Sequence, residues 1–208
     1  MSARQPWADE LLAPPLRRAS PQDRERVAQF LAAMDREGLY ERHFAHGEAP
    51  NQALLRRLDL LDQRERVAIL ALAHDGAVLG HGEYVGEDGE AEFAIMLLPL
   101  LRGRGVGTRL LGALLESARN AGQTRLHGVI QATNTRALQL VLRNGFRIIP
   151  GDDATVVIVS RELEAALPAQ TPGVAGHGYP DPANRHDFDR TSLYRRAEPG
   201  TPLRAGGG

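Results

Sequence analysis

The feature that most constrains this sequence is a glycine-rich turn between a short apolar segment and a long amphipathic helix. The apolar residues 95–98 lead into Pro99, which has no amide hydrogen for a sheet ladder and must end or edge a strand. The turn reads RGRGVG at residues 102–107, and apolar residues then recur at helical spacing from Val106 to Ala118. A strand, a tight turn and a helix in this order are typical of α/β proteins.

The glycines of this turn are typical of a site for an anionic ligand. They let the backbone turn sharply and approach a ligand, while the free amides at the helix start point outwards with the positive end of the helix dipole. Arg102 and Arg104 could add ion pairs to phosphate oxygens, so the segment suits a pyrophosphate. A P-loop would need Gly-Lys followed by Ser or Thr, and a Rossmann fingerprint would need a third glycine in place of Thr108. The remaining alternative is that the glycines serve only the turn.

The periodicity of the other segments predicts a mixed sheet covered by helices. Turn residues and apolar spacing predict strands at residues 16–18, 67–73, 78–85, 90–98, 126–130, 146–149 and 155–159. They predict helices at about 21–34, 51–61, 106–122 and 134–144, and an irregular link at 38–50. The predicted fold class is therefore α/β (α+β), with three layers in which helices pack on a mixed sheet.

Composition along the chain indicates one folded domain with an extension at each end. Apolar residues make up 42% and charged residues 25%, which is typical of a globular protein. We interpret residues 1–13 as an N-terminal extension and 14–167 as the domain. Residues 168–208 are rich in Pro, Gly and charge without periodicity, which predicts a disordered tail. His177 and His186 lie in this tail without a predicted helix or strand to hold them as ligands, so no metal is expected.

Several partner classes are disfavoured by composition. The start of the chain lacks the apolar stretch of a signal peptide, and no run approaches the ~20 apolar residues of a membrane span. We therefore expect a soluble, cytoplasmic protein without a membrane partner. The formal charge of -1 gives no basic footprint for nucleic acid. The absence of cysteine excludes disulfides, thiolate zinc sites and a Cys nucleophile, and all 25 basic residues are arginine because lysine is absent.

Two motifs at compatible spacing resemble a known family. The Arg-x-x-Gly-x-Gly motif at 102–107 resembles the acetyl-CoA pyrophosphate motif of the GNAT acyltransferase superfamily. The downstream Asn134-x-x-Ala137-x-x-Leu140, followed by RNGF at 143–146, is similar to that superfamily's second cofactor motif. Over residues 15–162 the sequence most resembles bacterial protein lysine acetyltransferases. That closer resemblance depends on Pro15-Leu16-Arg17 with Asp23, Tyr40-x-Arg42-x-Phe44, Leu54-Leu55-x-Arg57-Leu58 and Ala91-Glu92-Phe93-Ala94.

The resemblance implies an acetyl-CoA-dependent N-acetyltransferase that acts on a protein lysine by direct attack of the amine on the thioester. A small-molecule amine acetyltransferase and a non-catalytic acyl-CoA-binding regulatory module are the alternatives, and the protein is expected to be a monomer or homodimer. The implied fold is the GNAT-type α/β/α arrangement with a mixed, splayed central sheet. The implied acetyl-CoA-binding residues are Met96, Leu97, Leu98, Arg102, Gly103, Arg104, Gly105, Val106, Gly107, Thr108 and Asn134.

The resemblance also implies roles in the reaction itself. It implies that a backbone amide of the strand before the turn, from Leu97 or Met96, polarises the thioester carbonyl and stabilises the oxyanion. A lysine amine, with a pKa of about 10.4, must lose a proton before it can attack. Glu92 is the candidate general base, because the resemblance assigns that role to the Glu of an Ala-Glu motif and because desolvation in an apolar strand would raise its pKa. Glu83 and Glu90 are the alternatives.

A general acid is harder to assign. Many GNAT enzymes carry a Tyr directly after the position of Leu140, where this chain has Val141. A thiol with a pKa of about 8.5 leaves without much help, so a specific acid can be absent. Tyr84, His81 and His127 are candidates to replace it. By the same resemblance, Arg42 and Phe44 are expected to border the acceptor site.

Overall fold

The computed structural model describes residues 13–43, 49–151 and 153–164. Within these ranges seven strands form one sheet in the order β1-β2-β3-β4-β5-β7-β6. All neighbours are antiparallel except β4 and β5, which are parallel. The strands are β1 (Leu16–Arg18), β2 (Arg66–Leu72), β3 (Val78–Glu87), β4 (Glu90–Leu97), β5 (Arg125–Gln131), β6 (Arg147–Ile149) and β7 (Val156–Glu162).

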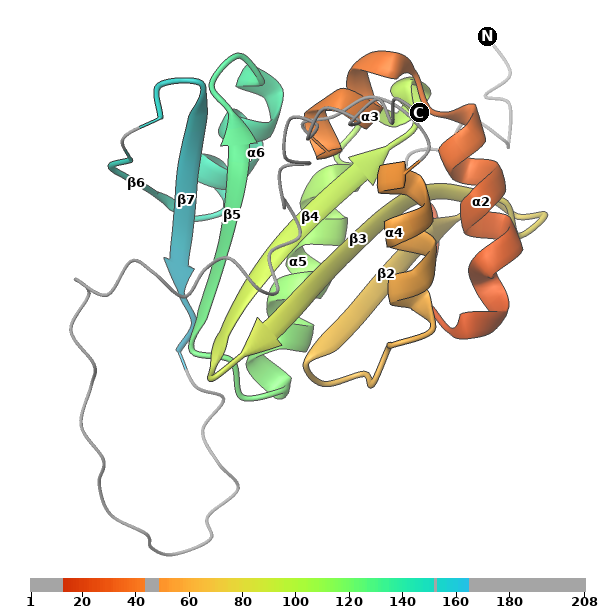
Figure 1. Cartoon of the computed structure of the whole chain (residues 1–208), viewed down its shortest axis with the longest axis horizontal. Coiled ribbons are helices and arrows are strands. Elements are labelled where there is room, and N and C mark those ends of the chain that lie inside the picture. Colours follow the sequence, from red (N-terminus) through yellow and green to blue (C-terminus); the bar gives the residue numbers. More distant parts are fainter. Residues whose placement is uncertain (1–12, 44–48, 152, 165–208) are drawn as a thin grey trace, which may run out of the picture.

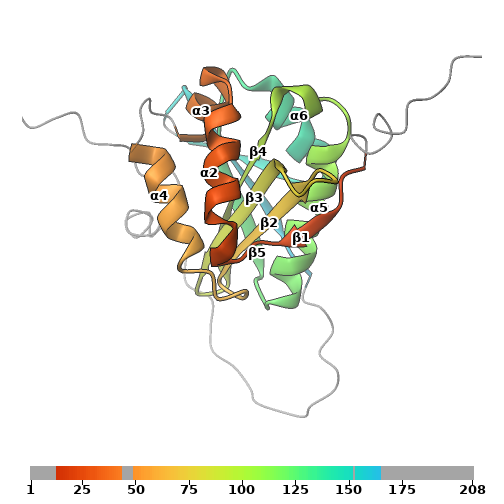
Figure 2. The same ribbon diagram turned by 90° about the vertical axis from the view of Figure 1, so that its right-hand side faces the viewer.

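Helices cover both faces of the sheet and produce the expected three layers. Figures 1 and 2 show α2 and α4 on one face of β2–β4, and α5 on the other. No helix in the described ranges is both long enough and apolar enough to cross a bilayer. The helices are α2 (Arg24–Ala33), α3 (Arg36–His43), α4 (Ala49–Leu58), α5 (Val106–Asn120) and α6 (Thr135–Arg143), with 3-10 turns at Pro21–Asp23 and Pro99–Leu101.

The two faces of the sheet bury separate hydrophobic clusters. Fully buried leucines of α5, such as Leu110 and Leu114, pack with Phe93 and Leu126 against one face. On the other face, residues of α2 and α4 pack with Met96 of β4. Each fully buried aliphatic side chain contributes about 1.5–3 kcal/mol, so these clusters hold β4 firmly from both sides.

The sheet divides between its two parallel strands. β4 pairs with β3 over its whole length, up to Gly80 opposite Leu97. Its pairing with β5 stops after three pairs, at Glu92 opposite His127. Phe93 comes next, and its ring lies so close to β5 that a Cβ on Gly128 would be 2.8 Å from Phe93 Cε1. Beyond this point the two strands diverge, as Figure 1 shows, and one edge of β4 has no strand beside it. This is the splay that the resemblance implies.

The prediction of an irregular link at 38–50 was wrong. Residues Arg36–His43 form α3, although the helix is mostly polar. Asp35 precedes the helix and accepts a hydrogen bond from the Gly38 amide at 3.0 Å, which is the geometry of an N-cap. Leu39 packs against the cluster beneath α2 and α4 and anchors the helix. The predicted tail at 168–208, and the extension apart from residue 13, lie outside the described residues.

Candidate active site

The glycine-rich turn has the geometry that its sequence predicts. Gly103 and Gly105 have φ angles of 74° and 82°, which L side chains rarely adopt, and Gly105 is the N-cap of α5. A Cβ on either glycine would meet nothing within 4 Å, so the turn faces open space. The first amides of α5 have no acceptor inside the helix. Both the amides and the space in front of them fit a diphosphate.

The third glycine of the motif has a different role. Gly107 is buried in the first turn of α5 and lies against side chains from two other elements. A Cβ there would be 3.3 Å from Leu140 of α6 and 3.4 Å from Leu97 of β4. Gly107 therefore lets the start of α5 approach the ends of β4 and α6. Val106 is fully buried and anchors the helix start, whereas Thr108 is exposed.

The backbone amides of β4 alternate between its two edges. The Leu98 amide donates to the Leu79 carbonyl on β3 at 3.0 Å. By alternation the Met96 amide also faces β3, whereas the amides of Leu97 and Ile95 face the open edge. Of the two amides expected to polarise the thioester, only that of Leu97 is therefore directed to the side where a ligand could lie. The Met96 amide does not have this orientation, and its side chain is buried on the face beneath α2 and α4.

The two arginines of the turn differ in their surroundings. Arg104 is exposed and forms no salt bridge within the described part of the chain. Arg102 instead forms a bidentate pair with Asp35, with Nη1–Oδ2 and Nη2–Oδ1 distances of 2.9 and 2.7 Å. The expected pairing of Arg102 with phosphate thus competes with a carboxylate of the protein itself.

Glu92 lies at the point where the sheet divides. It is only 8% exposed and shares a face of β4 with Met96, the face covered by α2 and α4. Its neighbours in register are Val85 on β3 and His127 on β5, and the pair with His127 is the last before the strands diverge. Glu92 therefore lies on the same strand as the open-edge amides, a few residues before them.

The two alternative bases have protein partners. Glu83 is 3% exposed and accepts two hydrogen bonds from Arg57 of α4, at 3.2 and 2.8 Å. Glu90 is half-buried and pairs with Arg125 at 2.8 Å. Each of these two carboxylates is therefore bound to an arginine of the protein itself.

The candidates for a general acid are not equivalent. Tyr84 is fully buried on the α5 face, away from Glu92, and donates a hydrogen bond to the Arg64 carbonyl at 3.0 Å. It is therefore wrongly placed for the role. Burial, reinforced by nearby Arg125, lowers the pKa of His127 to about 4, so this side chain is neutral at neutral pH. His81 is 1% exposed, and Val141 is buried where many GNAT enzymes carry their Tyr.

Comparisons with known proteins agree with this geometry. The sequence model of the Acetyltransferase (GNAT) family matches residues 28–146. An acetyltransferase of Pseudomonas aeruginosa, PA5475, is 30% identical over 144 residues, which are 66% of this chain and 77% of that protein. The chain belongs to the GNAT acetyltransferase family. An uncharacterised N-acetyltransferase of Mycobacterium tuberculosis is 32% identical over 85 residues, 40% of this chain and 54% of that protein.

Solved GNAT structures share the fold. The GNAT domain of S. lividans PAT superposes with a TM-score of 0.66 at 23% identity, covering 71% of this chain and 89% of that one. A phosphinothricin acetyltransferase of Sinorhizobium meliloti, solved with acetyl-CoA, has a TM-score of 0.62 at 20% identity and covers 77% and 93%. As a GNAT acetyltransferase, the protein is an acyltransferase with acetyl-CoA as the acetyl donor.

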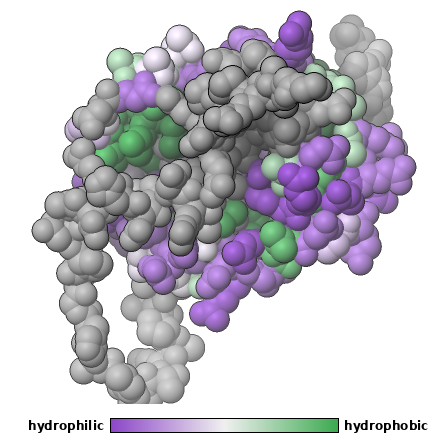
Figure 3. Space-filling model, in the orientation of Figure 1, coloured by the Kyte–Doolittle hydropathy of each residue, from purple (hydrophilic) through white to green (hydrophobic). Residues whose placement is uncertain are grey.

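Other predicted residues of this GNAT domain can be placed in part. The Asn134 side chain caps α6 by accepting a hydrogen bond from the Ala137 amide at 2.9 Å. On the face that carries Glu92, the half-buried Val129 and Ile158 lie beyond the splay, and Figure 3 shows an apolar area over β5 and β7. Phe44 and the side chain of Arg42 lie outside the described residues.

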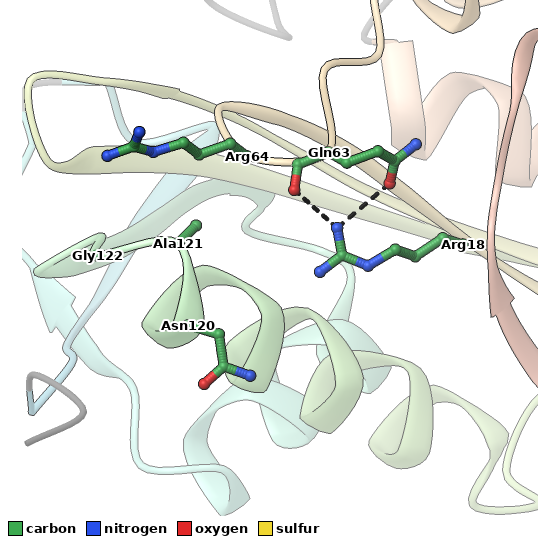
Figure 4. Close-up of a pocket in the computed structure, with 6 residues that line it drawn as sticks. All are labelled: Arg18, Gln63, Arg64, Asn120, Ala121 and Gly122. Atoms are coloured by element: carbon green, nitrogen blue, oxygen red, sulfur yellow. Dashed lines mark hydrogen bonds between the residues drawn. The ribbon is translucent and has the colours of Figure 1, made fainter. Parts of the chain in front are cut away.

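A cavity of about 390 Å³ at the other end of α5 is not the reaction site. Figure 4 shows its lining, in which Arg18 binds the carbonyl and side-chain oxygens of Gln63 at 2.7 and 3.2 Å. The cavity also borders Asn120, the last residue of α5, whereas the glycine-rich turn precedes the first. Fifteen helical residues span about 22 Å, so the cavity is far from Gly105.

Proposed function

We propose that this GNAT acetyltransferase acetylates the side-chain amine of a protein lysine, with Glu92 as the general base. The observation that carries the proposal is the position of Glu92 at the last β4–β5 pair before the strands diverge. It places a buried carboxylate and two outward amides on one strand. An amine that approaches the open edge from the Glu92 face would meet both.

Glu92 supplies the proton acceptor in this mechanism. A protonated amine cannot attack, and a carboxylate takes up its proton directly or through one water molecule. Glu92 is only 8% exposed, and in this proposal it takes up the proton at the point where β4 and β5 diverge. The tetrahedral intermediate then breaks its C–S bond and releases coenzyme A as a thiolate, which takes up a proton from solvent. No side chain needs to form a covalent bond with the acetyl group.

The turn and the open edge hold the donor in this proposal. Acetyl-CoA supplies an acetyl group activated as a thioester. The amides of the 103–107 turn and the exposed Arg104 bind phosphate oxygens, and the Leu97 amide donates to the carbonyl oxygen as it gains negative charge. The open edge of β4 offers the Ile95 amide as a further donor for the arm of the donor.

The depth of Glu92 favours lysine as the acceptor. A base that is 92% buried can be reached only by an amine that extends well beyond the body of its molecule. Lysine carries its amine on a flexible four-carbon stem, so the amine can reach Glu92 while the peptide stays at the surface. A compact amine would have to bury its whole body.

A conservative substitution tests the base. Glu92→Gln should lower kcat by about 10²–10⁴-fold and leave acetyl-CoA affinity nearly intact. Glu90→Gln is the matched control, because Glu90 lies on the same strand and face but is bound to Arg125 at the surface. Turnover is followed as thiol release, and affinity by calorimetry. Equal turnover in wild type and Glu92→Gln would remove Glu92 from the role.

The choice of acceptor tests the rest of the proposal. Lysine-containing peptides or proteins should release thiol above the hydrolysis background, with mass spectrometry locating the new acetyl group on a lysine. Activity confined to small amines would show that the acceptor is a small molecule and not a protein lysine. Tight acetyl-CoA binding without turnover on any amine would instead indicate a non-catalytic acyl-CoA-binding module.

The donor site has a control with matched backbone geometry. Gly105→Ala should weaken acetyl-CoA binding about tenfold, because φ of 82° is strained for alanine and the helix start would shift. Gly89→Ala introduces the same strain at φ of 84° in the β3–β4 turn, at the opposite end of β4 from Leu97 and the glycine-rich turn. Equal acetyl-CoA affinity in the two variants would show that the turn is not the donor site.

A further inference from the structure

Arg102 opens the donor turn but is bound to a distant part of the chain. Its guanidinium forms a fork with Asp35, 67 residues earlier in the sequence, at 2.7 and 2.9 Å. The Arg102 side chain is only 18% exposed and that of Asp35 is 35% exposed. This ion pair is therefore more shielded than a surface pair, and its planar two-bond geometry fixes the relative orientation of the two segments.

The contact is also tightly packed. Gly38, in the first turn of α3, lies directly over the ion pair. A Cβ on Gly38 would be 2.5 Å from Arg102 Nη2 and 2.6 Å from Asp35 Oδ1. Only a residue without a side chain can occupy this position while the pair stays in place. Asp35 at the same time caps α3 by accepting from the Gly38 amide.

The pair connects the two halves of the candidate active site. On one side, Arg102 is covalently continuous with the turn at 103–107 that faces the donor. On the other side, Asp35 begins α3, which packs against β4 on the face that carries Glu92. Figure 2 shows α3 and the turn that leads into α5 at the same end of the molecule. α3 therefore lies on the same face of β4 as Glu92.

We propose that Asp35 and Arg102 are positioning residues. Their ion pair fixes the position of α3, on the acceptor side of the site, relative to the donor turn. The inference rests on the acetyl transfer proposed above. Donor binding orders the 102–107 turn, and the fork transmits this order to the start of α3. Bound donor therefore improves acceptor binding, and by linkage bound acceptor improves donor binding by the same factor. Arg104, which has no such partner in the described part of the chain, remains the arginine for phosphate.

Kinetics with conservative variants test this coupling. Asp35→Asn keeps an oxygen to cap α3 but removes the charge, and Arg102→Gln removes the fork from the other side. Asp35→Asn should raise the acceptor KM about tenfold at saturating acetyl-CoA, with little change in kcat or in donor affinity, and Arg102→Gln should raise the acceptor KM by a similar factor. Asp59→Asn is the matched control, because it removes an exposed pair between Arg24 of α2 and Asp59, the residue directly after α4.

A double variant separates coupling from simple damage. Asp35→Asn combined with Arg102→Gln should raise the acceptor KM no more than either single variant does, because both substitutions remove the same ion pair. A role for Arg102 in phosphate binding predicts the opposite pattern. Arg102→Gln would then weaken donor affinity about tenfold, Asp35→Asn would leave the acceptor KM unchanged, and the proposal would be overturned.

Hydrogen exchange provides a readout that needs no turnover. Coenzyme A should slow amide exchange in a peptide covering residues 34–43 of the wild-type protein, and this protection should be lost in Asp35→Asn. If no acceptor is turned over but the protection pattern holds, the proposed function fails and the coupling stands. If turnover is normal but coenzyme A leaves exchange in this peptide unchanged, the coupling fails and the function stands.

Discussion

Two Arg–Asp forks in this protein have nearly the same geometry but different surroundings. Arg17 and Asp23 are six residues apart and pair at 2.6 and 2.8 Å, while Arg102 and Asp35 are 67 residues apart and pair at 2.7 and 2.9 Å. Asp23 also accepts from the Ser20 amide and hydroxyl, and its side chain is 2% exposed. The Asp35 side chain is 35% exposed.

The comparison separates stability from positioning. The Asp23 fork ties β1 to the start of α2 with many bonds in a buried place, so its loss leaves several polar groups unsatisfied. The Asp35 fork has fewer bonds and is partly wet, so it contributes less to folding. It joins the start of α3 to the turn at 102–107, which comes 67 residues later in the chain. Similar distances therefore do not imply similar roles.

The largest expected effect is on the buried fork. Asp23→Ala should lower the free energy of unfolding by about 3 kcal/mol, because it leaves Arg17 and the Ser20 amide without their acceptor. Urea unfolding at neutral pH measures the loss, with Asp59→Ala as the exposed control, for which about 0.5 kcal/mol is expected. A similar small loss for both variants would break the distinction between buried and exposed pairs.

The pH dependence of unfolding can also distinguish the two Arg–Asp forks, but the contribution of His127 has to be measured first. His127 has a folded-state pKa of about 4, below its usual 6.5, so only the unfolded chain gains a proton between these values. Stability should therefore fall by about 2 kcal/mol between pH 6.5 and 4 in the wild type. Unfolding curves of His127→Gln should be flatter over this range. An unchanged slope would contradict the lowered pKa.

Below pH 4, Asp23 and Asp35 should contribute differently to the pH dependence of unfolding. Hydrogen bonds from Arg17 hold the pKa of Asp23 well below its ordinary value, and hydrogen bonds from Arg102 lower that of Asp35. Each contributes stability above the unfolded pKa of about 3.9 and loses it as pH falls towards its folded pKa. Asp35→Asn should cost only about 1 kcal/mol at neutral pH, and should flatten the acid limb less than Asp23→Asn does. Equal flattening would contradict the comparison.

The smallest expected effect is that of salt. In about 1 M NaCl the difference between wild type and Asp35→Asn should shrink by roughly 0.5 kcal/mol, because the pair is partly exposed to screening ions. The difference between wild type and Asp23→Ala should change less, because that carboxylate is excluded from solvent. The measurement is again urea unfolding, now at two salt concentrations. A larger salt effect on Asp23→Ala would reverse the assignment.

Local patterns in the sequence predicted most of the fold and the geometry of the glycine-rich turn. The leucines of α5 and the apolar run of β4 placed these elements within two residues of their observed bounds. α3 was missed because its sequence is polar and has no apolar period, although Asp35 before it is a typical N-cap. The orientation of the β4 amides could have been derived by counting back from Pro99 in steps of two.

The partners of the site residues could not be predicted from the sequence. Nothing local to Arg102 indicates that its guanidinium binds a carboxylate 67 residues away. Likewise, the hydrogen bonds from Arg57 to Glu83 depend on how α4 packs across the sheet. These contacts follow from tertiary packing, which periodicity does not encode.

The early end of the β4–β5 ladder also affects the resistance of the folded protein to unfolding. Three pairs of residues join the two halves of the sheet, and beyond them the amides of Ile95 and Leu97 face an edge without a strand. A ligand that pairs with this edge acts as a missing strand, and it raises the free energy of unfolding with the logarithm of its concentration. Resistance of this enzyme to heat and proteolysis should therefore follow the supply of its own acetyl donor.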